Sequence, residues 1–229
     1  MNSSFITRFK QIFTPSFIAP LNKTISRTEY IPIDLSSDNP ELVNLDMSDP
    51  DKMESYIKEY LIQNNGQVAY GGYLEKRNLY KSSALFQHNS LAPRNIHLGV
   101  DFWSSAGTQV ITPLDGVLHS FNDNSSSGDY GPTIILEHKF EEEVFYTLYG
   151  HLSKLSLEPL YIGKTFKAGD LLGTLGRPQE NVNYAPHLHF QLILDLEGRK
   201  GDYPGVCSNE DKNFFYNNCP NPTLVLAID

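Results

Sequence analysis

Hydrophobic runs separated by short polar turns fill much of the second half of the chain, which is a pattern typical of strands. From Gly107 onward, runs rich in β-branched and aromatic residues are separated by turns of Gly, Asn, Asp and Ser. The runs cover residues 110–118, 133–138, 144–152, 171–175 and 188–196. The pattern predicts a mainly β fold with minor α, built as an antiparallel folded sheet that resembles a β-sandwich.

A helical spacing occurs earlier in the chain, between residues 48 and 66. Ser48-Asp49-Pro50 is typical of a helix start, and Asn64-Asn65-Gly66 of a helix end. The apolar residues between them recur three or four positions apart: Met53, Tyr56, Ile57, Tyr60 and Leu61. This pattern predicts one N-terminal amphipathic helix whose tyrosines pack against the core.

The region before this helix shows no clear period. Residues 1–46 are mixed and interrupted by prolines, so we expect an extended arm or an irregular lead-in that packs on the domain or lies over its groove. We therefore divide the chain into an N-terminal arm and helix, residues 1–66, and a main domain, residues 67–229.

Composition and charge narrow the class of partner. The chain has 229 residues, 40% of them hydrophobic, which is consistent with one globular catalytic domain and an additional segment. Its formal net charge of −9 argues against nucleic acid or an anionic membrane surface as the main partner. No run approaches the ~20 apolar residues of a membrane span, so no transmembrane segment is expected. The acidic run Glu141-Glu142-Glu143 predicts a solvated hairpin turn.

The N-terminus does not resemble a secretion signal. Arg8 and Lys10 are basic, but the apolar stretch 12–21 contains Pro15 and Pro20 and lacks a clear cleavage site. The sequence therefore predicts a cytoplasmic location. Cys207 and Cys219 are expected to be free thiols, or one loop disulfide if the protein is exported.

The candidate chemistry lies in two separated histidine phrases. On a strand, His187 and His189 would point to the same face and so into one cleft. With His97 and Asp101 upstream, they offer the three N or O ligands that a catalytic zinc site uses, and a further histidine to handle protons. The His-x-His phrase alone is equally typical of two hydrogen-bonded histidines on a strand.

An ordered set of further motifs accompanies these residues over roughly half the chain. The set comprises Arg94, His97-x-x-x-Asp101, residues 107–110, residues 115–118, residues 131–138, Tyr149-Gly150-His151-Leu152, Gly163, residues 167–173, Gly176 and residues 186–190. The chain thereby resembles the lysostaphin-like, or LytM-like, family of zinc metallopeptidases of DD-endopeptidase type. Most members of this family cut peptide bonds in bacterial cell walls.

The resemblance implies a role for each of the five residues. It implies that His97, Asp101 and His189 bind Zn²⁺, and that His151 and His187 serve as general base and transition-state stabiliser. It further implies a zinc-dependent endopeptidase that hydrolyses peptide bonds in peptidoglycan stem peptides or cross-bridges with metal-activated water. A periplasmic or cell-envelope location, implied by the family, is the alternative to the cytoplasmic one. No feature of the sequence assigns an oligomeric state.

Two departures from the family pattern concern the rim of the groove. Residues 177–184 replace the short T-G-x-S segment of many relatives, so we expect a reshaped rim. Residues 87–96 contain no tyrosine, whereas some relatives place one there as an oxyanion partner.

Two alternative functions remain: a non-catalytic peptide- or cell-wall-binding or regulatory module, and an intracellular metallohydrolase acting on a small amide or peptide. His88, His119 and His138 are expected to have no direct role, and residues 70–73 are expected to form a turn under packing rings.

Overall fold

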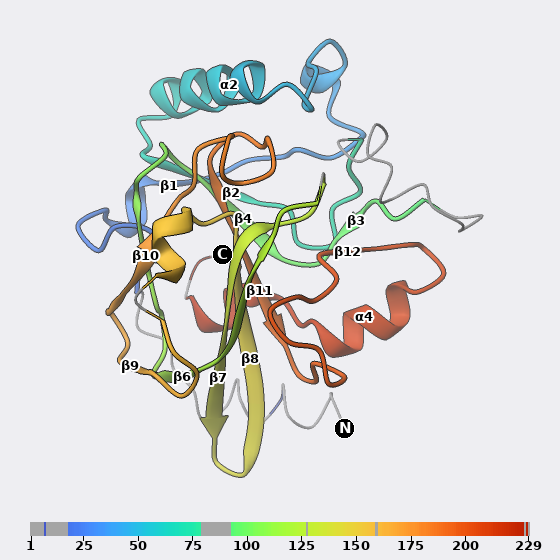
Figure 1. Ribbon diagram of the computed structural model, residues 1–229. Helices are drawn as coiled ribbons and strands as arrows, with labels where there is room; N and C mark the ends of the chain where they lie inside the picture. Colours follow the sequence, from blue (N-terminus) through green and yellow to red (C-terminus); the bar gives the residue numbers. More distant parts are fainter. Residues whose placement is uncertain are drawn as a thin grey trace.

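The fold is built on one large sheet. The computed structural model describes residue 7 and residues 18–78, 93–126, 128–158, 160–226 and 228. Within them, eight strands form a sheet in the order β1-β2-β4-β11-β8-β7-β6-β9, and two small sheets pair β10 with β5 and β12 with β3 (Figure 1). Every neighbouring pair is antiparallel except the parallel pair β1–β2. The prediction of a mainly β fold with an antiparallel sheet is confirmed.

The elements of the described residues have the following bounds. The strands are β1 (Tyr30–Pro32), β2 (Val68–Gly71), β3 (Ile96–His97), β4 (Val100–Trp103), β5 (Gln109–Ile111), β6 (Gly116–Asn124), β7 (Gly131–Phe140), β8 (Glu143–Gly150), β9 (Thr165–Phe166), β10 (Leu171–Thr174), β11 (His187–Ile193) and β12 (Val206–Cys207). The helices are α2 (Pro50–Gln63) and α4 (Lys212–Asn218), with short 3₁₀ turns η1 (Arg27–Glu29), η2 (Pro40–Leu42), η4 (Lys154–Leu157) and η5 (Pro222–Val225).

One predicted strand is wrong in its extent. The run 110–118 divides into β5 and β6, which belong to different sheets. Pro113 has no N–H to donate to a ladder, and the backbone N–H of Thr112 instead donates to Asp170 O at 3.0 Å. The other four predicted strands correspond to β7, β8, β10 and β11, with ends that differ by a few residues.

The predicted helix is α2, and its start follows from the predicted capping residues. The Asp49 side chain accepts hydrogen bonds from the backbone N–H groups of Asp51 and Lys52, and Pro50 occupies the first turn. Met53 and Ile57 are buried in a small core that also contains Trp103 of β4. The apolar stripe of α2 therefore packs across one end of the central sheet (Figure 1). The sequence analysis did not predict α4.

The described part of the arm is packed onto the main sheet. β1 pairs with β2 in register Tyr30↔Val68, and Leu21 forms a bridge with Val110. Leu21 is fully buried in the main core. Residues 18–46 thus pack on the domain, which is one of the two arrangements expected for the arm. The boundary at residue 66 stays a prediction.

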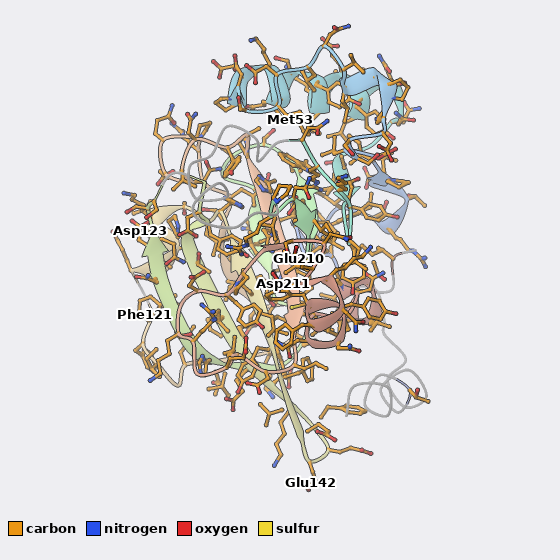
Figure 2. The ribbon with its side chains drawn as sticks, turned by 90° about the vertical axis from the view of Figure 1, so that its right-hand side faces the viewer. Met53, Phe121, Asp123, Glu142, Glu210 and Asp211 are labelled. Carbon is orange, nitrogen blue, oxygen red and sulfur yellow. The ribbon has the colours of Figure 1, made fainter. Side chains whose placement is uncertain are left out.

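Two surface features follow from local pattern. The acidic run Glu141–Glu143 is exposed at the turn between β7 and β8, with Glu142 at the tip of the hairpin (Figure 2). Cys207 and Cys219 are both buried free thiols. Among the described residues, no helix combines the length and the hydropathy that crossing a bilayer requires.

Candidate metal centre and active site

The three predicted metal ligands meet where β4 and β11 face each other. His189 lies directly opposite Asp101 in the antiparallel register, and His97 ends β3 just before β4 begins. All three residues are at most 3% exposed. Gly99, in the turn after His97, permits the close approach of the His189 ring, because a Cβ at this position would lie 2.7 Å from His189 Cε1. The pairing of distant segments thus brings the predicted ligands together.

The donor atoms of these residues converge on one point. His97 Nε2 lies 2.9 Å from His189 Nδ1, and Asp101 Oδ1 lies 3.2 Å from each of these nitrogens. The other ring nitrogens are engaged, since His97 Nδ1 contacts Gly72 O and His189 Nε2 contacts Gln191 Oε1, both at 2.9 Å. Because carbonyl oxygens only accept, these contacts assign the ring protons to His97 Nδ1 and His189 Nε2. Two unprotonated nitrogens and a carboxylate oxygen then face each other, which favours a cation between them.

This arrangement fits zinc. Zn²⁺ bound by nitrogen and oxygen at ~2.0–2.1 Å in a tetrahedron separates its ligand atoms by roughly 3.3 Å. The separations of 2.9 to 3.2 Å among the three donor atoms are close to that value. Three protein ligands also leave the fourth position that a catalytic zinc site keeps for water or substrate. His97, Asp101 and His189 are therefore a group that can hold a metal ion.

Burial sets the protonation states of the site. It lowers the pKa of His97 and of His187 to about 4, although Asp101 opposes both shifts. Burial, aided by His187, lowers the pKa of His151 well below its usual value. Burial alone would raise the pKa of Asp101, but His97 and Arg77 hold it well below its usual range. At neutral pH, His97 is thus neutral and Asp101 ionised, as metal ligands require, and His151 and His187 are also neutral.

His151, one of the two histidines predicted as catalytic, is held in an unusual backbone conformation. It follows the last residue of β8 and has a φ of 62°, in the left-handed region that residues other than glycine seldom adopt. Its N–H donates to Tyr130 O at 2.9 Å, and its carbonyl accepts from Gly176 N at 3.0 Å. Such strained residues cluster at functional sites. Its Nδ1 is buried and has no hydrogen-bond partner among the described residues.

His187, the second predicted catalytic residue, lies beside His151 with ring centroids 4.2 Å apart. Its Nδ1 donates to Ala185 O at 2.8 Å, which leaves Nε2 as its unprotonated nitrogen. Its ring stacks on Trp103 with centroids 4.1 Å apart. The stack and the hydrogen bond together fix the orientation of the imidazole.

A single cleft contains all of the predicted site residues. Its volume is about 290 Å³, and His97, Asp101, His151, His187 and His189 all line it. The predicted alternation along β11 is therefore seen in the structure, because His187 and His189 open into the same space. Their roles as ligands and catalysts stay proposals.

Two of the tyrosines that line the cleft lie beside the site histidines. The edge of Tyr184 meets His151 with ring centroids 5.1 Å apart, and Tyr130 lies 5.0 Å from His189. Val182 and Asn183, just before Tyr184, have φ values of 60° and 67°, so the segment expected to reshape the rim makes a tight turn there. Phenols therefore line the cleft even though residues 87–96 contain no tyrosine.

Two residues of the site were missed by the sequence analysis. Gln191 continues the i, i+2 series of His187 and His189, so the alternation already placed it on the ligand face. Arg77 contacts Asp101 from a segment with no recognisable motif, and nothing in the local sequence indicates this contact.

The other described histidines, His119 and His138, contact groups outside the proposed site. His138 is buried between Asp115 O and Thr147 Oγ1, and His119 lies 2.9 Å from Ser120 Oγ. His88 lies outside the described residues. The expected turn at 70–73 begins later: Tyr70 and Gly71 belong to β2, and the turn starts at Gly72, whose carbonyl accepts from Glu75 N. The packing part of the expectation holds for Tyr70, which stacks on Phe102. Gly72 also contacts the metal-site residue His97, as described above.

Comparison with known proteins identifies the matched part of the chain. Residues 95–201 match the model of Peptidase family M23. An uncharacterized metalloprotease of Haemophilus influenzae is 32% identical over 127 residues, which is 52% of this chain and 24% of that protein. The DD-carboxypeptidase/endopeptidase Mpg of Neisseria meningitidis serogroup B is 29% identical over 108 residues, covering 47% of this chain and 22% of that protein. The chain thus spans about a quarter of the length of the curated relatives it matches.

The chain also has a structural neighbour. The catalytic domain of the antimicrobial peptidase lysostaphin from Staphylococcus simulans aligns with a TM-score of 0.40 and 25% identity, covering 66% of this chain and 93% of that one.

Proposed function

Residues 95–201 are a lysostaphin-like Peptidase family M23 domain, a metallopeptidase domain of the hydrolase class, and on this premise we propose that the chain is a zinc-dependent endopeptidase. The observation that carries the proposal is the convergence of two unprotonated imidazole nitrogens and one carboxylate oxygen within 3.2 Å of each other. His97, Asp101 and His189 would hold the ion. When bound, Zn²⁺ supplies a Lewis acid that acidifies water and polarises a carbonyl group.

The chain's own residues move the proton. His187 has its tautomer fixed by Ala185 O, so its Nε2 is the acceptor we assign as general base. It takes a proton from the attacking water and returns it to the leaving amine. His151, which lines the same cleft, is assigned to hydrogen-bond the oxygen that becomes negative in the transition state. The buried walls around both rings limit access of bulk water to this proton.

For the substrate we propose peptide bonds of bacterial peptidoglycan, in stem peptides or cross-bridges. The name of the Neisseria relative, DD-carboxypeptidase/endopeptidase, supports this choice. A peptidoglycan substrate would place the enzyme in the cell envelope, which cell fractionation with an antibody against the chain would check.

The test combines metal content with digestion of purified peptidoglycan, in which released peptides are identified by mass spectrometry. Wild type is expected to hold about one zinc per chain and to release peptides with new amino termini. His189→Ala should lose the metal, whereas His151→Ala should keep it and lose hydrolysis. His119→Ala, which removes a histidine outside the cleft, is the matched control.

Other outcomes would assign the chain differently. Zinc binding with no cleavage of peptidoglycan or of a peptide library would refute the peptidase proposal and favour a binding module. Cleavage of small peptides alone would refute the peptidoglycan assignment and favour a metallohydrolase with another substrate. Hydrolysis that survives both His151→Ala and His189→Ala would overturn the assigned site.

A further inference from the structure

Arg77 is one of the largest fully buried side chains of the described residues and is only 1% exposed. It lies outside the segment 95–201 that matches the peptidase family. A guanidinium cannot lose its proton inside a protein, so a buried arginine must be paired with acceptors. Its partners therefore indicate what it does.

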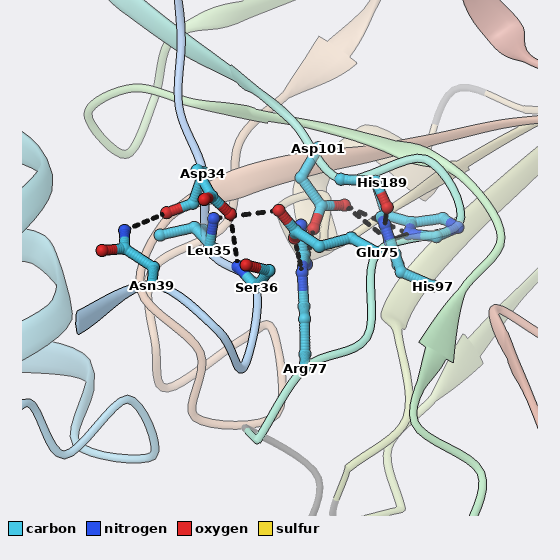
Figure 3. Close-up of polar contacts among 10 residues, drawn as sticks. Asp34, Leu35, Ser36, Asn39, Glu75, Arg77, His97, Asp101 and His189 are labelled. Atoms are coloured by element: carbon cyan, nitrogen blue, oxygen red, sulfur yellow. Dashed lines mark hydrogen bonds and ion pairs between the residues drawn. The ribbon is translucent and has the colours of Figure 1, made fainter. Parts of the chain in front are cut away.

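Those partners are two carboxylates, one of them the proposed metal ligand. Arg77 Nη1 contacts Asp101 Oδ2, and Arg77 Nε contacts Glu75 Oε2 (Figure 3). The guanidinium thus lies between Glu75 and Asp101. The planar fork of arginine can hold two carboxylates in fixed directions at once, whereas the ammonium of lysine acts as a single point charge.

The two carboxylate oxygens of Asp101 have different partners. Oδ1 faces His97 Nε2 and His189 Nδ1, at 3.2 Å from each, while Oδ2 is occupied by Arg77. We propose that Arg77 is a positioning residue that restricts Asp101 to binding the metal through one oxygen. This inference rests on the metal site of the proposed function. A carboxylate without such a partner can rotate and bind through both oxygens, which changes the coordination number and the open position of the metal.

The guanidinium of Arg77 occupies space that is free because Gly72 has no side chain. A Cβ at Gly72 would lie 2.0 Å from Arg77 Nη2 and 2.9 Å from His97 Nδ1, and the φ of Gly72 is +103°. The carbonyl of the same residue accepts the hydrogen bond from His97 Nδ1 at 2.9 Å. Gly72 thus contacts both the positioning residue and a ligand, and only glycine fits there.

Glu75 connects this arrangement to the N-terminal arm. Its Oε1 accepts a hydrogen bond from the backbone N–H of Leu35 at 2.9 Å, and its own carbonyl accepts from His97 N at 2.9 Å. The backbone N–H of Arg77 bonds to Asn95 O at 2.9 Å. A continuous series of polar contacts therefore runs from residues 34–39 through Glu75 and Arg77 to Asp101 (Figure 3).

The experiment compares Arg77→Lys with wild type, both loaded with Co²⁺ in place of zinc. Visible absorption of Co²⁺ reports coordination number, because four-coordinate sites absorb more strongly than five-coordinate ones. Zinc affinity is measured by competition with a chromophoric chelator. Arg77→Lys should bind zinc about 10–100-fold more weakly, which is the usual effect of losing a group that orients a metal ligand. Its Co²⁺ spectrum should become weaker as Asp101 gains a second metal contact.

Control measurements distinguish failure of the positioning role from failure of the proposed metal site. Arg27→Met, which removes an exposed guanidinium from η1, should leave affinity and spectrum unchanged. Equal affinity and an equal spectrum in Arg77→Lys would overturn the positioning role. If that variant does not fold, Glu75→Gln is measured in its place, and unchanged values would overturn the role as well. Failure of wild type to bind Co²⁺ or Zn²⁺ would instead refute the metal site of the proposed function.

Discussion

His138 should make folding stability depend on pH from a position outside the proposed metal site. On β7, its Nδ1 lies 2.7 Å from Asp115 O and its Nε2 lies 2.6 Å from Thr147 Oγ1. Burial lowers the pKa of His138 to about 4 from an ordinary value of 6.5, although Asp115 opposes the shift. The unfolded chain therefore binds a proton between these pH values that the folded chain does not bind.

The sign and size of the effect follow from this difference. Because the folded pKa of His138 is the lower one, its effect on stability is absent above pH 6.5 and grows as the pH falls towards about 4. The whole difference in pKa corresponds to a loss of about 3 kcal/mol, at ~1.4 kcal/mol for each pH unit. Between pH 7.5 and pH 5, single-site linkage gives a loss of about 2 kcal/mol.

Urea unfolding of the metal-free protein measures this loss, with fluorescence of Trp103, the single tryptophan, as the signal. His138→Gln cannot take up the proton but keeps one donor and one acceptor for the same pocket. The free energy of unfolding of wild type should fall about 2 kcal/mol more than that of His138→Gln between pH 7.5 and 5. His119→Gln is the matched control for removing a histidine from the neighbouring strand. Equal falls in wild type and His138→Gln would refute the reasoning.

Three further predictions concern the ligands and the first helix. Gly99→Ala should displace the His189 ring, since the new Cβ would lie 2.7 Å from its Cε1, and zinc content of the purified variant should fall below half. Gln191→Leu removes the acceptor of His189 Nε2, so zinc affinity in chelator competition should drop about 10–100-fold; unchanged affinity would contradict the assigned tautomer. Asp49→Ala removes the N-cap of α2 and should cost about 1 kcal/mol in urea unfolding, whereas an unchanged midpoint would show that the cap is dispensable.

Local sequence was sufficient for the elements with a strong period. The spacing of Met53 and Ile57 and the capping signal at Asp49 predict α2 correctly, because helix start and apolar stripe are properties of consecutive residues. Runs of β-branched and aromatic residues between turn residues predict β7, β8 and β11 for the same reason. β1 and α4 were not predicted, since a strand of three residues and a helix of seven are stabilised by their neighbours rather than by their own pattern.

For the site, the sequence by itself determined which residue types are present and in what order. His187 and His189 share a face because strand geometry fixes the direction of alternate side chains. The ordered motifs add His97, Asp101 and His151 through resemblance. These features depend on short range geometry or on the matched segment alone.

Only the tertiary structure decided how these residues combine. The register of β4 against β11 places Asp101 opposite His189, and the turn at Gly72 brings Arg77 onto the remaining oxygen of Asp101. Hydrogen bonds to Gly72 and Gln191 select the ring nitrogens of His97 and His189 that face each other and Asp101. Such contacts join segments far apart in the chain, so their energies depend on the packing of the whole sheet, and no local pattern encodes them.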